Sequence, residues 1–534
     1  MKLYQLKKQA LEIGIKDFYA YVRNFYLEKN GFDTIEVDED KKETLDKIVS
    51  DAAELLKVDK ENLWDDKRFH LNFRITEEEI DALEDLEIDE KTIANANESV
   101  KEGRDMSILP LNALIGGDTI KKYIPFLIKR YSKDKKHTLD GYGIFTKRAK
   151  IEAIIEDKAG KQTIKLLASR KFDYAALANI TDYCPNGCAG CYKGSITRLK
   201  GLTLAEIDPN YREVKEKLEH DEKRAVEQIR LLTQWLNKHD EVDTIVISGG
   251  EPLFYKEETV GKILEEIAKA KYVDKVRICT GTVYNGSFFN ITDKMIEKFK
   301  EFKKNNPNKE FYINANVTDE NQLITPEAKI VTKRLKDAGI TIHLQMPIQE
   351  GINFYRDDLK KTAGKMIEVC RAAHKLGVDP YKAIVDIHSP DHPEITVPIE
   401  YVSKVLGALY GHKRKGDMAV WRVVNILDEQ GNEYVERNLN AEKEVDIKNG
   451  KVTYFLAAEN ILDNKITIHI YVEPLLPGIN DRGTLAKPIP KIREKINEVK
   501  KAYQLLREEK IDAEDFYRIS GIELSVNEPL IIKK

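Results

Sequence analysis

Three of the chain's five cysteines, Cys184, Cys188 and Cys191, lie in one short segment that reads CPNGCAGC. Thiolates at these spacings can surround one metal centre, because little chain has to be ordered between them. A closed zinc site needs four ligands, and no fourth Cys or His stands near this segment. A [4Fe-4S] cluster takes one cysteine per iron, so three cysteines would leave one iron open to an outside ligand. Simple packing of the thiols is the third interpretation, but Pro and Gly leave little core there, and the sequence favours the cluster.

Glycine and polar residues recur where predicted strands end. The six predicted strands are residues 175–181, 244–250, 276–282, 311–317, 341–348 and 382–388. Because the C-terminal ends of parallel strands meet at one face, we expect the residues there to share one site with the cysteines. These strand-end residues are Gly249, Gly250, Glu251, Pro252, Thr280, Gly281, Asn314, Asn316, Gln345, Asp386 and His388.

Helical segments alternate with these strands, which indicates parallel strands joined by helical crossovers. One helix is predicted to begin with Thr325 as its N-cap and Pro326 at its first position. The expected fold class is α/β: a partial (β/α)6 TIM-like barrel with a mostly helical N-terminal extension and a mixed α+β C-terminal extension. A doubly wound sheet is the alternative arrangement of the same units.

The flanks of the barrel carry no chemical motif. We predict a mostly helical region at 1–140, a β-hairpin at 141–170, the barrel at 171–419, and a β-rich extension with a terminal helix at 420–534. The basic run 121–136 is interpreted as a solvated helix face.

Composition describes a water-soluble, charge-rich chain. Of its 534 residues, 42% are hydrophobic and 33% charged, and the net charge is -4. This balance argues against a nucleic-acid partner, and no apolar run is long enough to span a bilayer. The few cysteines fit a reducing compartment, so we expect a cytoplasmic protein. Abundant Lys, Glu and Ile are typical of heat-adapted proteins. The oligomeric state stays open.

The cysteine segment resembles the CxxxCxxC loop of radical S-adenosylmethionine (SAM) enzymes, and SGGEP at 248–252 resembles their glycine-rich strand end. The segments ISGGEPL, VRICTGT, LITPEAKIVTKRLKDAGI and LQMPIQEGIN are further similar to the lysine 2,3-aminomutase, or KamA, family. This similarity covers about residues 170–425. It implies a [4Fe-4S] cluster on the three cysteines, with SAM bound to the open iron. An electron donor such as a ferredoxin or flavodoxin would reduce the cluster.

The resemblance also implies which residues meet SAM. Gly249, Gly250 and Glu251 would contact its methionyl end, where glycine allows close approach and a carboxylate can accept from an ammonium. Further residues on matching or neighbouring strand ends are Pro252, Thr280, Asn314, Gln345, Gly351 and Asn353.

The sequence departs from the KamA family where that family binds pyridoxal phosphate (PLP). The glycine run that precedes the family's PLP lysine is absent, and no lysine occurs between Lys415 and Lys443. Asn425 stands where the family has an acidic substrate contact, and YKG replaces an arginine-rich run after Cys191. A Schiff base needs an amine and a phosphate needs cations, so these departures argue against PLP.

Asp386 and His388 are the candidates for substrate binding or proton transfer, with Asp391 and His392 beside them. A loop satisfied by its own hydrogen bonds explains the same residues equally well.

The expected function is therefore that of a radical SAM enzyme. It would cleave SAM reductively to a 5'-deoxyadenosyl radical and abstract hydrogen from a small polar, amino-acid-like substrate. The alternatives are a PLP-dependent 2,3-aminomutase using a lysine such as Lys451, an RNA- or protein-modifying radical SAM enzyme, and a non-catalytic iron-sulfur protein.

Overall fold

The computed structural model describes most of the chain. The described residues are 2–101, 106–125, 150–157, 160–172, 174–188, 191, 212–385, 397–399, 401–402, 405, 423–427, 433–435, 441–460, 465–475, 488–521 and 529–533.

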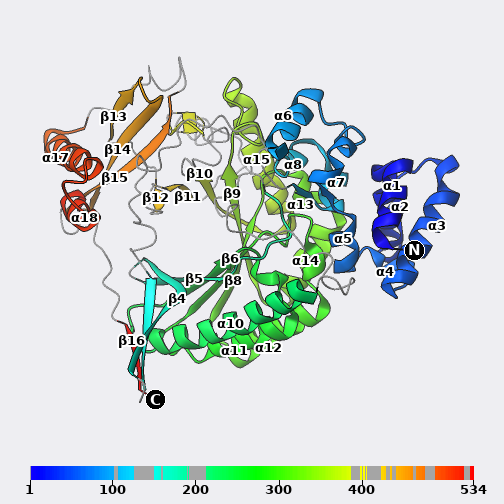
Figure 1. Ribbon diagram of the computed structural model, residues 1–534, viewed down its shortest axis with the longest axis horizontal. Helices are drawn as coiled ribbons and strands as arrows, with labels where there is room; N and C mark the ends of the chain where they lie inside the picture. Colours follow the sequence, from blue (N-terminus) through cyan, green and yellow to red (C-terminus); the bar gives the residue numbers. More distant parts are fainter. Residues whose placement is uncertain are drawn as a thin grey trace.

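Short helices make up most of the described N-terminal region, and they lie at one side of the molecule (Figure 1). Their apolar faces join the main core: Phe18, for example, contacts the rings of Phe69 and Phe73. The elements are α1 (Leu3–Ile13), α2 (Ile15–Lys29), α3 (Lys42–Leu56), α4 (Lys60–Leu63), α5 (Lys67–Phe73), β1 (Ile75–Thr76), α6 (Glu90–Lys101), β2 (Ser107–Ile108), α7 (Pro110–Ile115) and α8 (Gly117–Lys121), with 3-10 turns at Glu39–Lys41 and Glu77–Leu83.

An 11-stranded mixed sheet forms the centre of the molecule, and its strand order is β12-β11-β10-β9-β8-β7-β6-β5-β4-β3-β16. The seven strands from β5 to β11 are parallel and follow chain order, without the reversal that a doubly wound sheet requires. The strands are β3 (Lys150–Asp157), β4 (Gly160–Phe172), β5 (Ala175–Thr181), β6 (Thr244–Gly249), β7 (Lys275–Thr280), β8 (Glu310–Asn316), β9 (Thr341–Ile348), β10 (Asp379–Val385), β11 (Val423–Leu427), β12 (Glu433–Val435) and β16 (Leu530–Lys533).

Strands β3 and β4 pair as a hairpin, and strands lie at all six predicted positions with limits within three residues of the prediction, although residues 386–388 of the sixth lie outside the described part. The central sheet also includes the start of the region predicted as the C-terminal extension, because β11 lies after residue 419. This strand pairs parallel with β10, and only β12 is antiparallel to it. Strand direction depends on where the chain re-enters the sheet, which alternation of residue types does not encode. In addition, β16 at the end of the chain pairs parallel with β3 at the sheet edge.

Helices cover one face of the parallel strands (Figure 1). That face is apolar: Phe311 of β8 packs against Phe299 and Phe302 of α12, with ring centroids 5.2 and 5.4 Å apart. As predicted, α14 begins after Thr325, whose side chain accepts a hydrogen bond from the Ala328 N–H. The helices are α10 (Arg212–Leu236), α11 (Glu257–Ala268), α12 (Asp293–Asn305), α13 (Asn321–Ile324), α14 (Pro326–Asp337) and α15 (Leu359–Leu376), with 3-10 turns at Pro252–Phe254 and Phe288–Asn290.

The opposite face of the same strands is polar. In register across β7, β8 and β9 lie Cys279, Asn314 and His343. The ring of His343 stacks between the rings of Tyr312 and Tyr381, with 4.7 Å between ring centroids on each side. An alternation of apolar and polar residues thus gives the sheet one face for the core and one for chemistry.

A second, three-stranded sheet follows, made of β13 (Ala441–Asp446), β14 (Lys451–Asn460) and β15 (Lys465–Pro474). One face packs on α17 (Pro490–Arg507) and α18 (Ala513–Ser520) in a core of its own, while Tyr454 and Tyr471 join the main core. Buried Glu473 accepts hydrogen bonds from the Tyr454 hydroxyl and from the Ile399 N–H.

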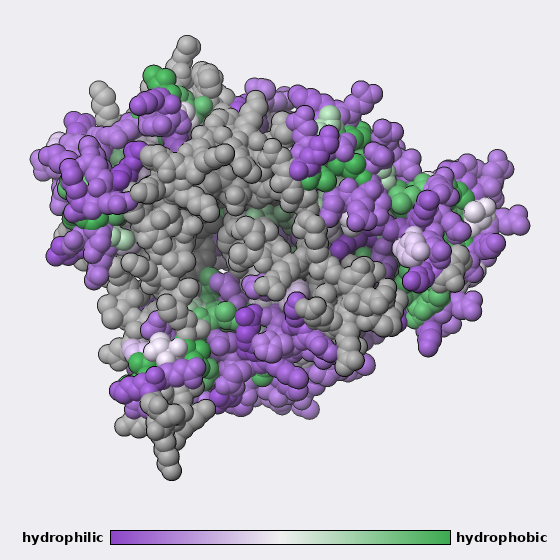
Figure 2. Space-filling view, viewed as in Figure 1, coloured by the Kyte–Doolittle hydropathy of each residue, from purple (hydrophilic) through white to green (hydrophobic). Residues whose placement is uncertain are grey.

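The described surface is mainly hydrophilic on the face drawn in Figure 2, with apolar side chains confined to small areas. Among the described helices, none is both long and apolar enough to cross a bilayer.

Candidate functional site

The three cysteines lie in the loop that follows β5, at the C-terminal ends of the parallel strands. A backbone hydrogen bond from the Cys191 N–H to the Cys188 carbonyl, 3.1 Å long, closes a tight turn between them. The Cys184 Sγ lies 3.5 Å from the Asn186 carbonyl oxygen. Along the chain, β5, the cysteines and α10 follow one another in the predicted order, although residues 189–190 and 192–211 lie outside the described part.

The thiols lie close enough to influence one another's ionisation. Burial raises the pKa of Cys184 well above the ordinary thiol value, and the charges of Glu251, Cys188 and Cys191 act in the same direction. Burial also raises the pKa of Cys188, where the positive charge of Lys122 is the largest opposing influence. Three half-buried thiols whose charges influence one another can hold an electron-rich metal centre.

The glycine pair after β6 explains how this loop is held. A Cβ atom on Gly250 would lie 2.2 Å from the Tyr183 carbonyl oxygen, and one on Gly249 would lie 2.4 Å from the Thr181 oxygen. Hydrogen bonds join the two loops at this point, from the Gly250 N–H to the Thr181 oxygen (2.5 Å) and from the Glu251 N–H to the Tyr183 oxygen (2.7 Å). The glycines thus let the β6 loop lie directly against the backbone that enters the cysteine loop.

Glu251 ties the end of β6 to the end of β7. Its carboxylate accepts hydrogen bonds from the Thr280 hydroxyl at 2.5 Å, the Gly281 N–H at 2.8 Å and the Leu253 N–H at 3.2 Å. The residue is 1% exposed, and burial raises its pKa although all these donors oppose the shift. Pro252 follows as the first residue of the buried 3-10 turn. A hydrogen bond from the Thr282 side chain opposes the shift as well, so several donors from the end of β7 and the turn after β6 hold this carboxylate in place.

Asn314 and Gln345 lie on the polar face of neighbouring strands. The Asn314 Nδ2 approaches the Cys279 Sγ at 3.7 Å, while its buried Oδ1 has no hydrogen-bond partner among the described residues. Gln345, 8% exposed, lies in register between Asn316 of β8 and Lys382 of β10. Asn314 therefore offers an acceptor to a ligand on this face.

Gly351 and Asn353 shape the turn after β9. Gly351 has a φ of +75°, a conformation that glycine adopts readily. The Asn353 side chain donates to the Thr318 and Pro347 carbonyls and accepts from the Gln349 N–H at 2.9 Å. These bonds use the Asn353 amide within the loop, so in this structure its side chain holds the backbone of the turn after β9 in place.

The N-terminal region contributes to the site, which the sequence did not indicate. Residues 106–122, here called the bridging segment, lie against loops at the ends of several parallel strands. The Ser107 hydroxyl donates to the Pro185 carbonyl at 3.1 Å inside the cysteine loop. A Cβ atom on Gly187 would lie 2.6 Å from the Ser107 Cβ, so the two backbones touch.

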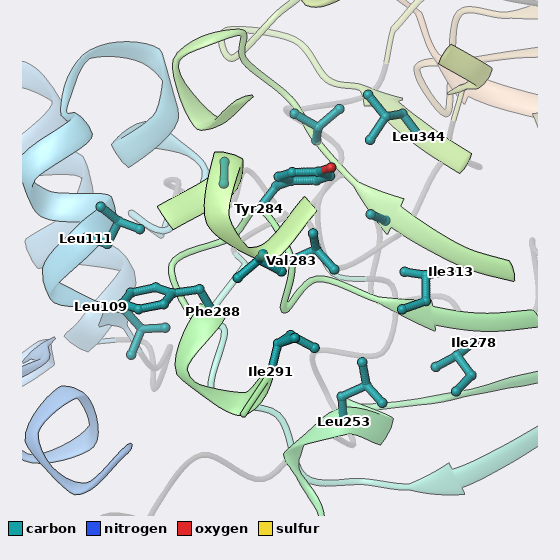
Figure 3. Close-up of a cluster of buried hydrophobic side chains, with 14 of the residues drawn as sticks. Leu109, Leu111, Leu253, Ile278, Val283, Tyr284, Phe288, Ile291, Ile313 and Leu344 are labelled. Carbon is teal, nitrogen blue, oxygen red and sulfur yellow. The ribbon is translucent and has the colours of Figure 1, made fainter. Parts of the chain in front are cut away.

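The same segment reaches the loops after β7 and β9. The Asn112 amide donates to the Asn285 carbonyl at 3.0 Å, and the Tyr355 hydroxyl donates to the Asp118 carboxylate. Figure 3 shows Leu109 beside Phe288 in the apolar cluster that anchors the segment. The bridging segment therefore fixes three strand-end loops relative to one another.

The interpretation of residues 121–136 as a solvated helix face is wrong at Lys122, which is 4% exposed. Its Nζ lies 3.3 Å from the Asn285 Oδ1. No sequence signal marks this lysine, because its burial depends on contacts with loops more than sixty residues away along the chain.

Several predicted residues lie outside the described part of the chain. These are Asp386, His388, Asp391, His392, the YKG segment at 192–194 and Lys415. Asn425 is on β11 and Lys451 begins β14, in the separate three-stranded sheet.

The cysteine loop supplies three thiols, the donor set of an iron–sulfur cluster with one open iron, and no fourth Cys or His stands near it in the sequence. Within the described residues, no three His, Cys, Asp or Glu side chains converge as the ligands of one ion. In a cluster each cysteine binds a different iron, so its thiols stand further apart than the ligands of a single zinc ion. In the same loop the Oδ1 atom of Asn186 is buried with no partner among the described residues, as expected of a group facing a ligand.

Comparison with known proteins agrees with this geometry. The sequence model of the radical SAM superfamily matches residues 178–389. An Aquifex aeolicus protein, provisionally named an L-lysine 2,3-aminomutase, is 26% identical over 231 residues, 43% of this chain and 54% of that protein. An uncharacterized KamA family protein of Methanocaldococcus jannaschii is 24% identical over 44% of this chain and 32% of its own length.

Glutamate 2,3-aminomutase of Clostridioides difficile is 21% identical over 41% of this chain and 47% of its length. The chain thus matches a third to about half of the length of these relatives. The bridging segment lies outside the matched residues of the superfamily model. Residues 178–389 therefore form a radical SAM domain, and this part of the chain is similar to proteins of the KamA family.

Proposed function

We propose that the protein is a radical SAM enzyme that acts on a small polar substrate. The observation that carries the proposal is the docking of the glycine pair, Gly249 and Gly250, on the backbone leading into the loop of Cys184, Cys188 and Cys191. Cys184, Cys188 and Cys191 would hold a [4Fe-4S] cluster, which would supply the one-electron reduction that cleaves SAM to methionine and a 5'-deoxyadenosyl radical.

The chain's own groups would bind and orient SAM around the cysteine loop. The Glu251 carboxylate, buried and held in place by its hydrogen-bond donors, carries a charge that complements the methionyl ammonium of SAM. Because the bridging segment and the β6 loop both touch the cysteine loop, the thiols keep their geometry as ligands enter.

The polar face of β7–β10 supports the substrate class. It presents Asn314 with an available acceptor, His343 between two aromatic rings, and Lys382, which is 7% exposed. Such groups bind carboxylate, amine or hydroxyl groups better than an apolar chain. An electron donor of the ferredoxin or flavodoxin class would deliver the reducing electron.

The experiment that tests the proposal follows the open iron directly. We would reconstitute the protein anaerobically, reduce it, and record the electron paramagnetic resonance (EPR) spectrum before and after adding SAM. An iron that accepts SAM changes the spectrum, whereas a cluster with four protein ligands leaves it unchanged and contradicts the proposal. Cys188→Ala should lose the cluster, while Cys370→Ala, at a fully buried position on α15, should keep it.

A PLP-dependent aminomutase is the second candidate, because two of the relatives above are named as aminomutases. Lys451, the lysine considered for it, begins a strand of the separate three-stranded sheet, and this placement does not favour the assignment. A PLP absorbance band in purified protein, lost on borohydride treatment with a labelled lysine, would establish this second function. Protein incubated with PLP and showing no such band would exclude it.

A further inference from the structure

The backbone of Tyr183, which leads into the cysteine loop, is held from both sides. Its carbonyl accepts a hydrogen bond from the Glu251 N–H at 2.7 Å. Its N–H donates to the Thr181 hydroxyl oxygen at 3.0 Å, and that hydroxyl donates in turn to the Asp221 carboxylate at 3.1 Å. A chain of hydrogen bonds, here called the relay, thus runs from Asp221 of α10 through Thr181 to the residue that precedes Cys184.

Asp221 is fixed by donors on both of its carboxylate oxygens. Its Oδ2 accepts from the Tyr255 hydroxyl at 2.6 Å as well as from Thr181, and its Oδ1 accepts from the Arg224 guanidinium. Asp221 is 6% exposed, Tyr255 3% and Thr181 2%. Water weakens hydrogen bonds little at such buried positions. The carboxylate is therefore a fixed point on α10 to which the end of β5 is bound.

The direction of these hydrogen bonds requires a carboxylate at position 221. A hydroxyl has one hydrogen, so Thr181 accepts from the Tyr183 N–H only while its own hydrogen points elsewhere. The ionised Asp221 carboxylate only accepts, and it therefore keeps the Thr181 hydrogen directed away from Tyr183. An asparagine has a single side-chain oxygen, which could serve Thr181 and Tyr255 or else Arg224, but not both sides.

We propose that Asp221 is a positioning residue for the iron–sulfur cluster, and that it acts through Thr181 on the backbone that presents Cys184. The inference rests on the proposed function. The glycine pair and Glu251 hold this backbone on its carbonyl side, so loss of the relay releases the Tyr183 N–H alone. Groups that orient a metal ligand change metal affinity by about 10–100-fold when they are removed. The relay would thus keep the first cysteine in place for its iron.

The test compares four variants of the full-length protein with the wild type. Thr181→Val keeps the shape of the side chain and removes the hydroxyl, while Thr181→Ser keeps the hydroxyl and removes a methyl group. Asp221→Asn keeps the shape of the carboxylate, and Glu222→Gln makes the same change at the next residue of α10. Glu222 is 7% exposed and accepts from the Lys256 N–H and the Thr259 hydroxyl, so it is equally buried but serves the start of α11.

Two properties are measured for each protein. Hydrogen exchange of the cluster-free protein, read at single residues by fragmentation mass spectrometry, reports on the Tyr183 N–H itself. Protein reconstituted anaerobically is then exposed to an iron chelator, and the loss of cluster absorbance gives the rate at which iron leaves.

We expect Thr181→Val and Asp221→Asn to exchange the Tyr183 N–H about tenfold faster than the wild type, because each variant removes the hydrogen bond that protects it. Iron should also leave these two variants about tenfold faster or more. Thr181→Ser and Glu222→Gln should match the wild type in both measurements. The two Thr181 variants separate hydrogen bonding from packing, because packing alone would make serine the more harmful change.

Three outcomes would overturn the inference. The first is wild-type exchange at Tyr183 in either Thr181→Val or Asp221→Asn. The second is an equal effect of Thr181→Ser and Thr181→Val, because packing and not the hydroxyl would then explain Thr181. The third is faster exchange with an unchanged rate of iron release, because the position of this backbone would then not matter to the cluster.

Failure of the wild-type protein to assemble any cluster would instead refute the proposed function. Exchange in the cluster-free protein would still show whether Asp221 holds the Tyr183 backbone, so the two failures are distinguishable.

Discussion

Replacing Gly250 with alanine tests whether the glycine pair exists to hold the cysteine loop. The new Cβ atom would lie 2.2 Å from the Tyr183 oxygen and 2.7 Å from its carbonyl carbon, both backbone atoms. An ordinary contact begins at 3.4 Å, so the loops must separate by about 1 Å. That movement strains the hydrogen bonds from Gly250 to Thr181 and from Glu251 to Tyr183.

The cost follows from these contacts. Two backbone hydrogen bonds contribute about 1 kcal/mol each, and overpacking of a close interface costs about 1–3 kcal/mol. We therefore expect Gly250→Ala to lower the free energy of unfolding by about 3–5 kcal/mol. Because Tyr183 directly precedes Cys184, the variant should also take up less iron on anaerobic reconstitution.

A matched glycine separates this effect from the general effect of adding a methyl group. Gly364 lies inside α15, and a Cβ atom there would meet no atom within 4 Å. Gly364→Ala should stabilise the protein by about 0.5–1 kcal/mol, because alanine loses less conformational entropy in a helix. Denaturant unfolding and iron analysis of both variants make the comparison. Wild-type stability and iron content in Gly250→Ala would refute the role assigned to the glycine pair.

Three further predictions concern the parts that hold the site. Arg23→Met should lower the free energy of unfolding by about 3–5 kcal/mol, because the buried Glu327 carboxylate would keep only the hydrogen bond from Trp64. Lys269→Met, which breaks an exposed ion pair with Glu266, should change that free energy little. Equal effects of the two substitutions in denaturant unfolding would contradict this. Burial raises the pKa of Cys370 to about 12, so at pH 8.5 its thiol stays protonated. Iodoacetamide should therefore label Cys370 only after unfolding, as followed by peptide mass analysis. Rapid labelling in the native protein would contradict this prediction. Leu530→Ala should lower the free energy of unfolding by about 2–4 kcal/mol, because Leu530 is 2% exposed in β16, the edge strand that pairs with β3. A change under 1 kcal/mol in thermal or denaturant unfolding would show that this strand adds no stability.

The features that could be predicted from sequence are those fixed by local pattern. The strands 175–181 and 341–348 have the predicted limits, because apolar runs and flanking turns mark them, and Thr325 caps its helix as its residue type suggests. The cysteine loop and the glycine pair were found because their residue types and spacing are rare outside such sites.

The remaining features depend on contacts between segments distant in sequence. The bridging segment reaches the cysteine loop through Ser107 and the loop after β7 through buried Lys122, and neither residue differs in type from many on the surface. The parallel pairing of β11 and β16 is likewise set by where the chain returns to the sheet. Tertiary packing decides these positions, and one sequence read by itself carries no signal of it.

The most direct test of the central claim is formation of 5'-deoxyadenosine. Anaerobically reconstituted protein is mixed with SAM and dithionite, and the nucleoside is quantified by chromatography beside Cys188→Ala prepared in the same way. We predict 5'-deoxyadenosine and methionine in equal amounts from the wild-type protein and neither from Cys188→Ala. Wild-type protein that carries a full, reduced cluster and still forms no 5'-deoxyadenosine would contradict the assignment as a radical SAM enzyme.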